Sequence, residues 1–162
     1  MQIAFIQTGG TIDKDYPKVT KGWGFEISDP AFNRILEKLN PSFSFKPYEA
    51  FKKDSQEITL EDREKLKSLC ESISEDKIII THGTDTIAET AKYLSGINKT
   101  IVITGAMKPE RFSNSDAPIN LGAAIAASQT LNEGCYIVMH GMVIPHDKVQ
   151  RDLQTGKYYT NE

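Results

Sequence analysis

The stretch "KIIITHGTDTIAETAKYLSG", residues 77–96, contains a strand, a loop and a helix in immediate succession. The continuous apolar run at 77–81 predicts a buried strand, and helical periodicity follows over 85–95 until Gly96. Two hydroxyls and the Asp85 carboxylate stand between the two elements, in Thr84-Asp85-Thr86. This order of elements indicates a fold in which strands and helices alternate.

The same alternation runs along the rest of the chain. Four more short apolar runs predict strands, at 2–7, 43–49, 100–104 and 135–140. Three further helices are expected from periodic apolar positions, within 28–41, 59–73 and 116–131. Alternating strands and helices form a parallel sheet covered on both faces. The predicted fold class is therefore α/β, with a flavodoxin-like three-layer parallel sheet of about five strands and helices on both faces.

The helix boundaries carry local signals of their own. In 28–41, Asp29 is placed to cap the helix and Pro30 suits its first turn. In 59–73, Thr59 is the expected cap. Cys70 and Cys135 lie in periodic apolar contexts with no metal-ligand spacing, so both are expected to be reduced core residues.

Bulk composition restricts the class of partner. The chain has 162 residues, 39% of them hydrophobic and 25% charged, with a formal net charge of −3. That length fits one domain over 1–162. The scattered basic residues give no footprint for nucleic acid or an anionic membrane, so a small molecule is the expected partner. No leader or long apolar segment is visible, so we expect a cytoplasmic protein.

Chemistry-bearing residues gather where the predicted strands end, because parallel strands bring their carboxyl ends to one edge of the sheet. Gly9-Gly10 and Thr11 follow the first strand, and Thr84 and Asp85 follow the third. Alone, each loop can be a simple turn or a helix cap, and the first could bind phosphate through backbone N–H groups. Together they offer a hydroxyl nucleophile and an activating group. No G-K-[ST] or G-x-G-x-x-G motif supports a nucleotide site.

Several motifs together identify a resemblance to a known family. "TGGTI" at 8–12 and "THGTDT" at 81–86 resemble the two signature motifs of the bacterial L-asparaginases. The resemblance continues through "DSQEIT" at 54–59 and through "TGAMKP" and "SDAPINLGAAIAAS" between 104 and 128. It implies an amidohydrolase, free of metal and cofactor, that converts asparagine, or a similar small ω-amide such as glutamine, to the acid and ammonia.

The resemblance also implies roles for individual residues. Thr11 matches the nucleophile, and Tyr16 matches its tyrosine partner. Thr84 and Asp85 match the hydroxyl and carboxylate that work with a lysine. The substrate-binding residues it implies are Ser55, Gln56, Asp85 and, through its backbone, Ala106.

Two departures from the family pattern are visible. Full-length members carry a second, C-terminal domain, whereas this chain resembles the N-terminal domain alone; we therefore expect a short, single-domain relative. At the lysine position the family register places Arg151, and the nearest lysine is Lys148. Both residues are candidates for the basic partner of Asp85. The family register favours Arg151, whereas the amine of Lys148 is better suited to transfer a proton.

Further expectations concern motion, assembly and rival functions. The Gly-punctuated segment 13–25 is expected to act as a lid. The apolar end "CYIVMHGMVI" at 135–144 predicts at least a homodimer. The rival functions are a non-catalytic amino-acid sensor and a flavodoxin-like nucleotide or flavin binder. Five residues are expected to have structural rather than catalytic roles: Trp23, Phe25, His82, His140 and His146.

Overall fold

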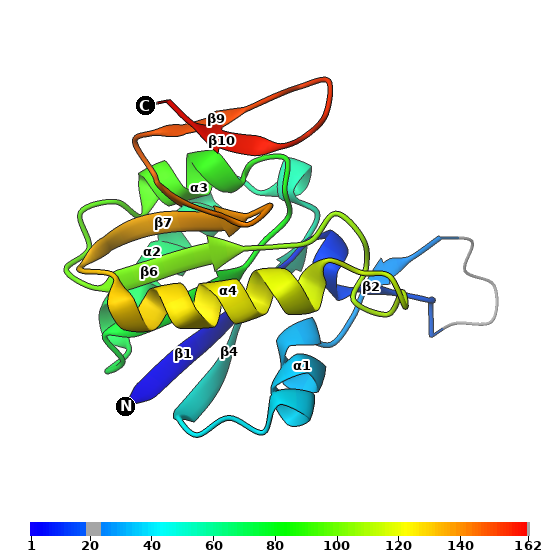
Figure 1. Cartoon of the computed structure of the whole chain (residues 1–162), viewed down its shortest axis with the longest axis horizontal. Coiled ribbons are helices and arrows are strands. Elements are labelled where there is room, and N and C mark those ends of the chain that lie inside the picture. The colour runs from blue at the N-terminus through cyan, green and yellow to red at the C-terminus, as the bar shows by residue number, and fades with distance from the viewer. Residues whose placement is uncertain (19–23, 162) are drawn as a thin grey trace.

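The core of the fold is a six-stranded sheet with the order β4-β1-β5-β6-β7-β8 (Figure 1). The structure is a computed structural model, and it describes residues 1–18 and 24–161. The strands are β1 (Gln2–Gly9), β4 (Ser44–Lys53), β5 (Lys77–Thr81), β6 (Thr100–Thr104), β7 (Gly134–Met139) and β8 (Met142–Pro145). The first five are parallel to one another, and β8 runs antiparallel to β7.

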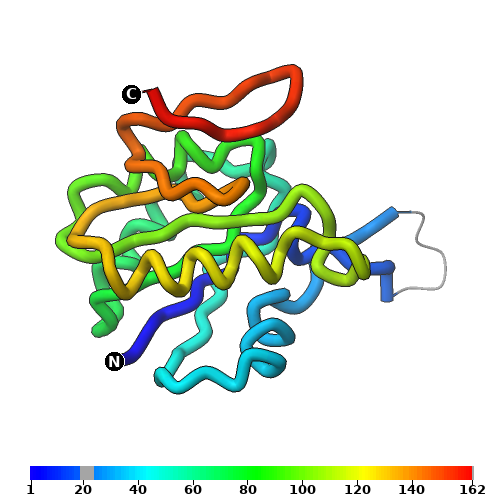
Figure 2. Tube along the Cα trace, viewed as in Figure 1, coloured from blue at the N-terminus to red at the C-terminus, as the bar shows by residue number. Residues whose placement is uncertain are grey.

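Helices cover both faces of this sheet, as the alternation predicts (Figure 2). They are α1 (Ala31–Leu39), α2 (Leu60–Ser72), α3 (Ile87–Tyr93) and α4 (Ala117–Thr130). Phe5 and Ile79 point from the sheet into a core shared with α1 and α4. Ile6 and Ile80, the next residues on their strands, point into the opposite core with α2 and α3. The period-2 alternation of strand side chains therefore fills both cores, and the three-layer α/β prediction is confirmed.

The strand order creates a position where connections leave in opposite directions. From β1 the chain moves to β4 on one side, and from β4 it crosses to β5 on the other. Loops that follow such neighbouring strands separate from each other and leave a crevice at the carboxyl edge of the sheet. The loops that carry Thr11 and Thr84 follow β1 and β5, so the topology places both at this switch point.

The sixth strand was not predicted. The apolar end of the chain was expected to contribute one strand over 135–140, but β7 ends at Met139 and β8 returns along it. His140 and Gly141 form the tight turn, with φ values of 53° and 76°. Positive φ at both central residues suits the twist of a two-residue hairpin. Because His140 occupies the first of these positions, the sequence lacks the Asn-Gly or Gly-Gly pattern that predicts a hairpin turn.

Two helix starts also differ from expectation. The predicted cap by Asp29 is wrong: α1 has no side-chain cap from that residue, and the Ala31 N–H instead donates to Asp13 Oδ1 at 2.7 Å. The helix expected over 85–95 begins later, at Ile87, so Asp85 lies outside it. The predicted Thr59 cap is confirmed as a full capping box with Asp62 at the start of α2.

Short elements complete the fold. Two-stranded ribbons are formed by β2 (Lys14–Asp15) with β3 (Glu26–Ile27), and by β9 (Val149–Arg151) with β10 (Tyr158–Thr160). Two 3-10 helices follow strand ends, η1 (Thr11–Asp13) after β1 and η2 (Ser55–Glu57) after β4. The ribbon of β2 and β3 lies at the base of the predicted lid, whose middle falls outside the described residues, as does Trp23.

Candidate active site

The loops after β1, β4 and β5 meet through glycines. A Cβ atom on Gly10 would lie 2.4 Å from the Gly83 Cα, and a Cβ atom on Gly83 would lie 2.6 Å from the Ser55 Cβ. No side chain fits at such distances, so only glycine lets the three backbones approach this closely. Gly10 also has a φ of 83° and donates its N–H to the Lys53 carbonyl at 3.0 Å. The glycines therefore bring Thr11, Ser55 and Thr84 into one region.

Thr11 and Thr84 both keep part of their side chains exposed at this edge of the sheet. Thr11 begins η1 directly after Gly10, and its neighbour Ile12 is fully buried, which fixes the backbone beneath it. Thr84 follows the buried Gly83 in the loop after β5. Two half-buried hydroxyls on anchored backbone are suitably placed to reach a bound small molecule.

Asp85 is the centre of a polar cluster. Its Oδ2 accepts from Gln56 Nε2 at 2.9 Å, and its Oδ1 accepts from an Arg151 Nη at 3.1 Å. The Asp85 N–H donates to Ser55 Oγ at 3.2 Å, and Ser55 is almost fully buried. The structure thus brings together Ser55, Gln56 and Asp85, three of the residues predicted to bind substrate.

Arg151, not Lys148, contacts Asp85. The same Arg151 Nη also donates to the Thr84 carbonyl at 3.2 Å, while its Nε donates to the Gly156 carbonyl at 3.2 Å. Lys148 lies exposed before β9, and within residues 1–18 and 24–161 its side chain takes part in no hydrogen bond or ion pair. Of the two candidates, Arg151 is therefore the one whose side chain lies beside Asp85.

Tyr158 is a site residue that sequence reasoning missed. It lies opposite Arg151 in the β9–β10 ribbon, is 4% exposed, and its hydroxyl donates to the Thr84 carbonyl. The Arg151 guanidinium sits 5.1 Å from the centre of its ring, an arrangement that favours a cation. Burial raises the pKa of the Tyr158 hydroxyl to about 12, so the group stays a neutral donor. In β10 the buried Tyr158 alternates with the exposed Tyr159, and neither belongs to a recognised motif of the sequence.

We expect Tyr158→Phe to lower kcat/KM about tenfold, because the variant keeps the ring beneath Arg151 but removes one of the two side-chain donors that hold the Thr84 carbonyl. Turnover of asparagine and thermal unfolding of the same preparation are the measurements. Tyr159→Phe removes the neighbouring exposed hydroxyl and should behave like the parent. Equal activity in both variants would show that the Tyr158 hydroxyl does not position Thr84.

Two predicted residues have no described contact with Thr11. Tyr16 is 75% exposed, its ring packs against Phe25 at 5.2 Å between centroids, and its N–H donates to Asp15. Phe25 also packs against Phe112, as expected for loop packing. Ala106 follows β6 and is buried beside the loops. The roles assigned to Tyr16 and Ala106 stay predictions.

His82 and the two cysteines have structural roles, as expected. His82 is fully buried, with Nδ1 2.7 Å from the Gly83 carbonyl and Nε2 2.8 Å from Thr90 Oγ1. Burial lowers the pKa of His82 to about 4, so the ring is neutral near pH 7. Cys70 and Cys135 are free and buried, and burial raises the pKa of each thiol to about 12.

Asp13 anchors the helical turn that begins with Thr11. It is fully buried, and its carboxylate accepts from Gln7 Nε2 at 3.0 Å and from the first N–H of α1. Burial raises the pKa of Asp13 from 3.8 to about 7, in spite of these hydrogen bonds. A raised carboxyl pKa gives stability that is complete below the unfolded-state value of 3.8 and is lost as the pH rises through 7.

We expect Asp13→Asn to raise the melting temperature relative to the parent, and to raise it more at pH 8 than at pH 4. The asparagine avoids the free-energy cost of a buried charge, about 4 kcal/mol at most above pH 7. It can still accept from Ala31 and can donate to Gln7 Oε1, which has no partner among the described residues. That rearrangement gives up the Gln7 bond to Ser28, so the gain will be smaller than the limit.

Thermal unfolding of Asp13→Asn, of the parent and of Asp29→Asn over this pH range is the measurement. Asp29 is exposed and pairs only with exposed Lys18 in the described structure, so Asp29→Asn should give a flat difference from the parent. A difference for Asp13→Asn that does not change with pH would contradict the burial argument.

A three-layer α/β fold with hydroxyl-bearing loops and a carboxylate at the switch point of its sheet defines a class of small-molecule site suited to nucleophilic chemistry. The chain belongs to the asparaginase family: the family model described as "Asparaginase, N-terminal" matches residues 2–156. The resemblance inferred from the motifs is thereby confirmed.

Individual relatives agree with this assignment. A glutaminase-asparaginase from Acinetobacter glutaminasificans is 27% identical over 95% of this chain and 49% of its own length. A probable periplasmic L-asparaginase from Haemophilus influenzae is 32% identical over 95% of this chain and 47% of its own length. The solved thermostable L-asparaginase from Thermococcus kodakarensis superposes with a TM-score of 0.83 at 26% identity, covering 99% of this chain and 51% of that one. The chain thus spans about half the length of these relatives.

Within the described part of the chain, no helix combines the length and apolar character needed to cross a membrane. The predicted cytoplasmic location stays a prediction.

Proposed function

We propose that this chain hydrolyses the side-chain amide of L-asparagine, or of a similar small ω-amide such as glutamine, to the acid and ammonia. The observation that carries the proposal is the Asp85 cluster beside the meeting point of the Thr11 and Thr84 loops, in a chain of the asparaginase family. The residues named here all lie on one α/β domain, and the reaction proposed for them uses no metal or cofactor.

Substrate binding follows from the charges of a free amino acid. The α-ammonium needs an anion, and Asp85 is half exposed, so its carboxylate can accept a further donor while Gln56 and Arg151 hold it. Ser55 Oγ accepts from Asp85 N–H and can donate its own proton to the α-carboxylate. In this proposal Ser55 and Gln56 fix the zwitterion, and the side-chain amide is directed toward Thr11.

The reaction proceeds in two steps. Thr11 Oγ attacks the amide carbon and loses its proton, and the amide nitrogen is protonated and leaves as ammonia, giving an acyl-enzyme. Water then attacks the ester and releases the acid and Thr11. Thr84 and Asp85 assist the proton transfers, and Arg151 holds the carboxylate in position. Ala106 contributes through its backbone near the amide, and Tyr16 approaches Thr11 when the loop closes over substrate.

Ammonia release on addition of asparagine and, separately, glutamine tests the proposal. Production of ammonia with equimolar aspartate or glutamate supports it. Saturable binding of asparagine without ammonia would instead establish the amino-acid sensor, and co-purified flavin or nucleotide would establish the flavodoxin-like binder.

Assembly is part of the same proposal. At least a homodimer is expected, and light scattering over a range of concentrations measures it. A constant monomer mass would contradict this expectation.

A further inference from the structure

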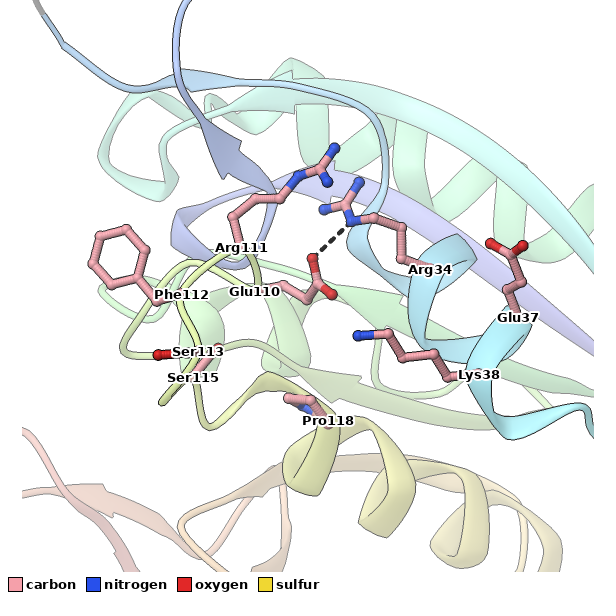
Figure 3. A pocket seen from close by; sticks show the side chains of 9 residues that line it. All are labelled: Arg34, Glu37, Lys38, Glu110, Arg111, Phe112, Ser113, Ser115 and Pro118. Atoms are coloured by element: carbon pink, nitrogen blue, oxygen red, sulfur yellow. Dashed lines mark hydrogen bonds and ion pairs between the residues drawn. The ribbon is translucent and has the colours of Figure 1, made fainter.

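A hollow of about 650 Å³ lies between α1 and the segment that joins β6 to α4 (Figure 3). Arg34 and Lys38 enter it from α1, and Glu110 and Arg111 enter it from the opposite segment, which also contributes Ser113 to the lining. Its volume is in the range of small-molecule sites. None of the candidate active-site residues lines it, so it requires an explanation of its own.

Two guanidinium groups face this hollow with most of their donors unused. Arg34 donates through Nε to Glu110 Oε2 at 2.7 Å, and Arg111 donates through Nε to an Asp15 oxygen at 2.9 Å. Among the described residues, the Nη groups of both arginines have no hydrogen-bond partner. Figure 3 shows the two guanidinium ends directed toward each other. Paired Nη donors match the oxygens of a carboxylate or phosphate.

The cationic side chains around the hollow keep donors that an anion could use. The Glu110 carboxylate is already paired with Arg34, and its side chain is only 5% exposed. The Lys38 amine points into the hollow, and in the described part of the chain it forms no ion pair. Glu37 is directed away from that amine in Figure 3. Arg34 and Arg111 are each paired with a carboxylate through Nε, so the donors left for an anion are their Nη groups and the amine of Lys38.

We propose that this hollow binds a small molecule through a phosphate or carboxylate group. The Nη groups of Arg34 and Arg111 donate to the oxygens of that group, and Lys38 approaches it from α1. The chemistry that the site recognises is an oxyanion, and the phosphate and carboxylate forms are separated by experiment.

Occupation of this site would reach the proposed active site through Arg111. The Asp15 carboxylate that accepts from Arg111 also accepts from the Tyr16 N–H at 2.8 Å, and Phe112 packs against Phe25 at 5.7 Å. A ligand that holds the Nη groups fixes Arg111 against Asp15, and so steadies the start of the loop that carries Tyr16. We expect the ligand to lower the KM for asparagine, a consequence that rests on the proposed function.

Isothermal titration calorimetry of the full chain at low salt, with inorganic phosphate and separately with malonate, tests the binding site. We expect saturable binding of at least one probe, and the tighter probe identifies the oxyanion. Lys38→Met and Arg111→Gln should each weaken binding about tenfold, because each removes a charged donor. Lys65→Met is the control: it removes one positive charge from an exposed position of α2, on the other face of the sheet, and should bind the probe like the parent.

Absence of saturable binding with both probes, or equal affinity in the parent, Lys38→Met and Arg111→Gln, would overturn the binding site. Lys38 makes no described contact that the fold depends on, so this arm does not rely on the Arg111 variant folding. Calorimetry needs no turnover, so its result is independent of the amidohydrolase proposal. If binding occurs but the KM for asparagine is the same with and without the probe, the coupling through Arg111 is wrong.

Discussion

Replacing Thr11 with alanine is expected to lower kcat for asparagine by roughly 10³-fold or more, because the variant lacks the oxygen that forms the acyl-enzyme. The fold should survive. The Thr11 side chain is partly exposed, and the backbone around it is held by other groups: the Gly10 N–H bond to Lys53, the buried Ile12 side chain and the Asp13 carboxylate. The free energy of unfolding should change by about 1 kcal/mol or less.

Thr11→Ser is the matched control, because it keeps the hydroxyl and removes only a methyl group. It should retain most of the activity that Thr11→Ala loses, with both variants unfolding near the parent temperature. Steady-state ammonia release and a thermal melt on the same samples are sufficient. Full activity in Thr11→Ala would assign the attack to another hydroxyl, and Thr84→Ala would then be the variant to examine.

The central strands of the sheet could be predicted because they are apolar on both faces. Strands such as 77–81 and 100–104 match the predicted bounds, since a strand buried between two helical layers has no polar face to confuse the pattern. The neighbourhood of Thr11 and Thr84 followed from the same reasoning, because parallel strands order their carboxyl ends along one edge. The glycines that bring their loops together are visible in the motifs themselves.

Contacts made by the end of the chain could not be predicted from local patterns. The pairing of Arg151 with Asp85 was one of two alternatives, and only the family register suggested it, because the residues are 66 apart and their ion pair depends on where the β9–β10 ribbon folds over the sheet. Tyr158 belongs to no motif, and only its pairing with Arg151 directs its hydroxyl to Thr84. Asp13 displaced the expected cap Asp29 because a buried carboxylate reaches α1 across the loop, 18 residues away in sequence. Local propensity contains no information about such long-range contacts.

Replacing Arg151 with methionine is expected to lower kcat by roughly 10²-fold, whereas Lys148→Met should leave kcat close to that of the parent. Arg151 Nη holds both the Asp85 carboxylate and the Thr84 carbonyl, so its loss leaves these two groups without their shared donor. Lys148 has no such contact in the described structure and lies exposed before β9. Both variants remove one positive charge from the same segment, so each controls for the electrostatic effect of the other.

Arg151→Lys separates holding Asp85 from transferring a proton. A guanidinium keeps its proton in proteins, so Arg151 can orient Asp85 but cannot act as a base, whereas an amine whose pKa is lowered by burial can. If the proton relay is limiting, Arg151→Lys should turn over asparagine faster than the parent, with kcat rising as the pH increases. If orientation of Asp85 by the guanidinium is limiting, Arg151→Lys should be slower than the parent and should show no new pH dependence.

A collapse of kcat in Lys148→Met, with Arg151→Met near the parent, would move the role to Lys148 and require the segment 146–150 to rearrange when substrate binds. Near-parent rates in both methionine variants would mean that Thr84 and Asp85 work without a basic partner from this segment.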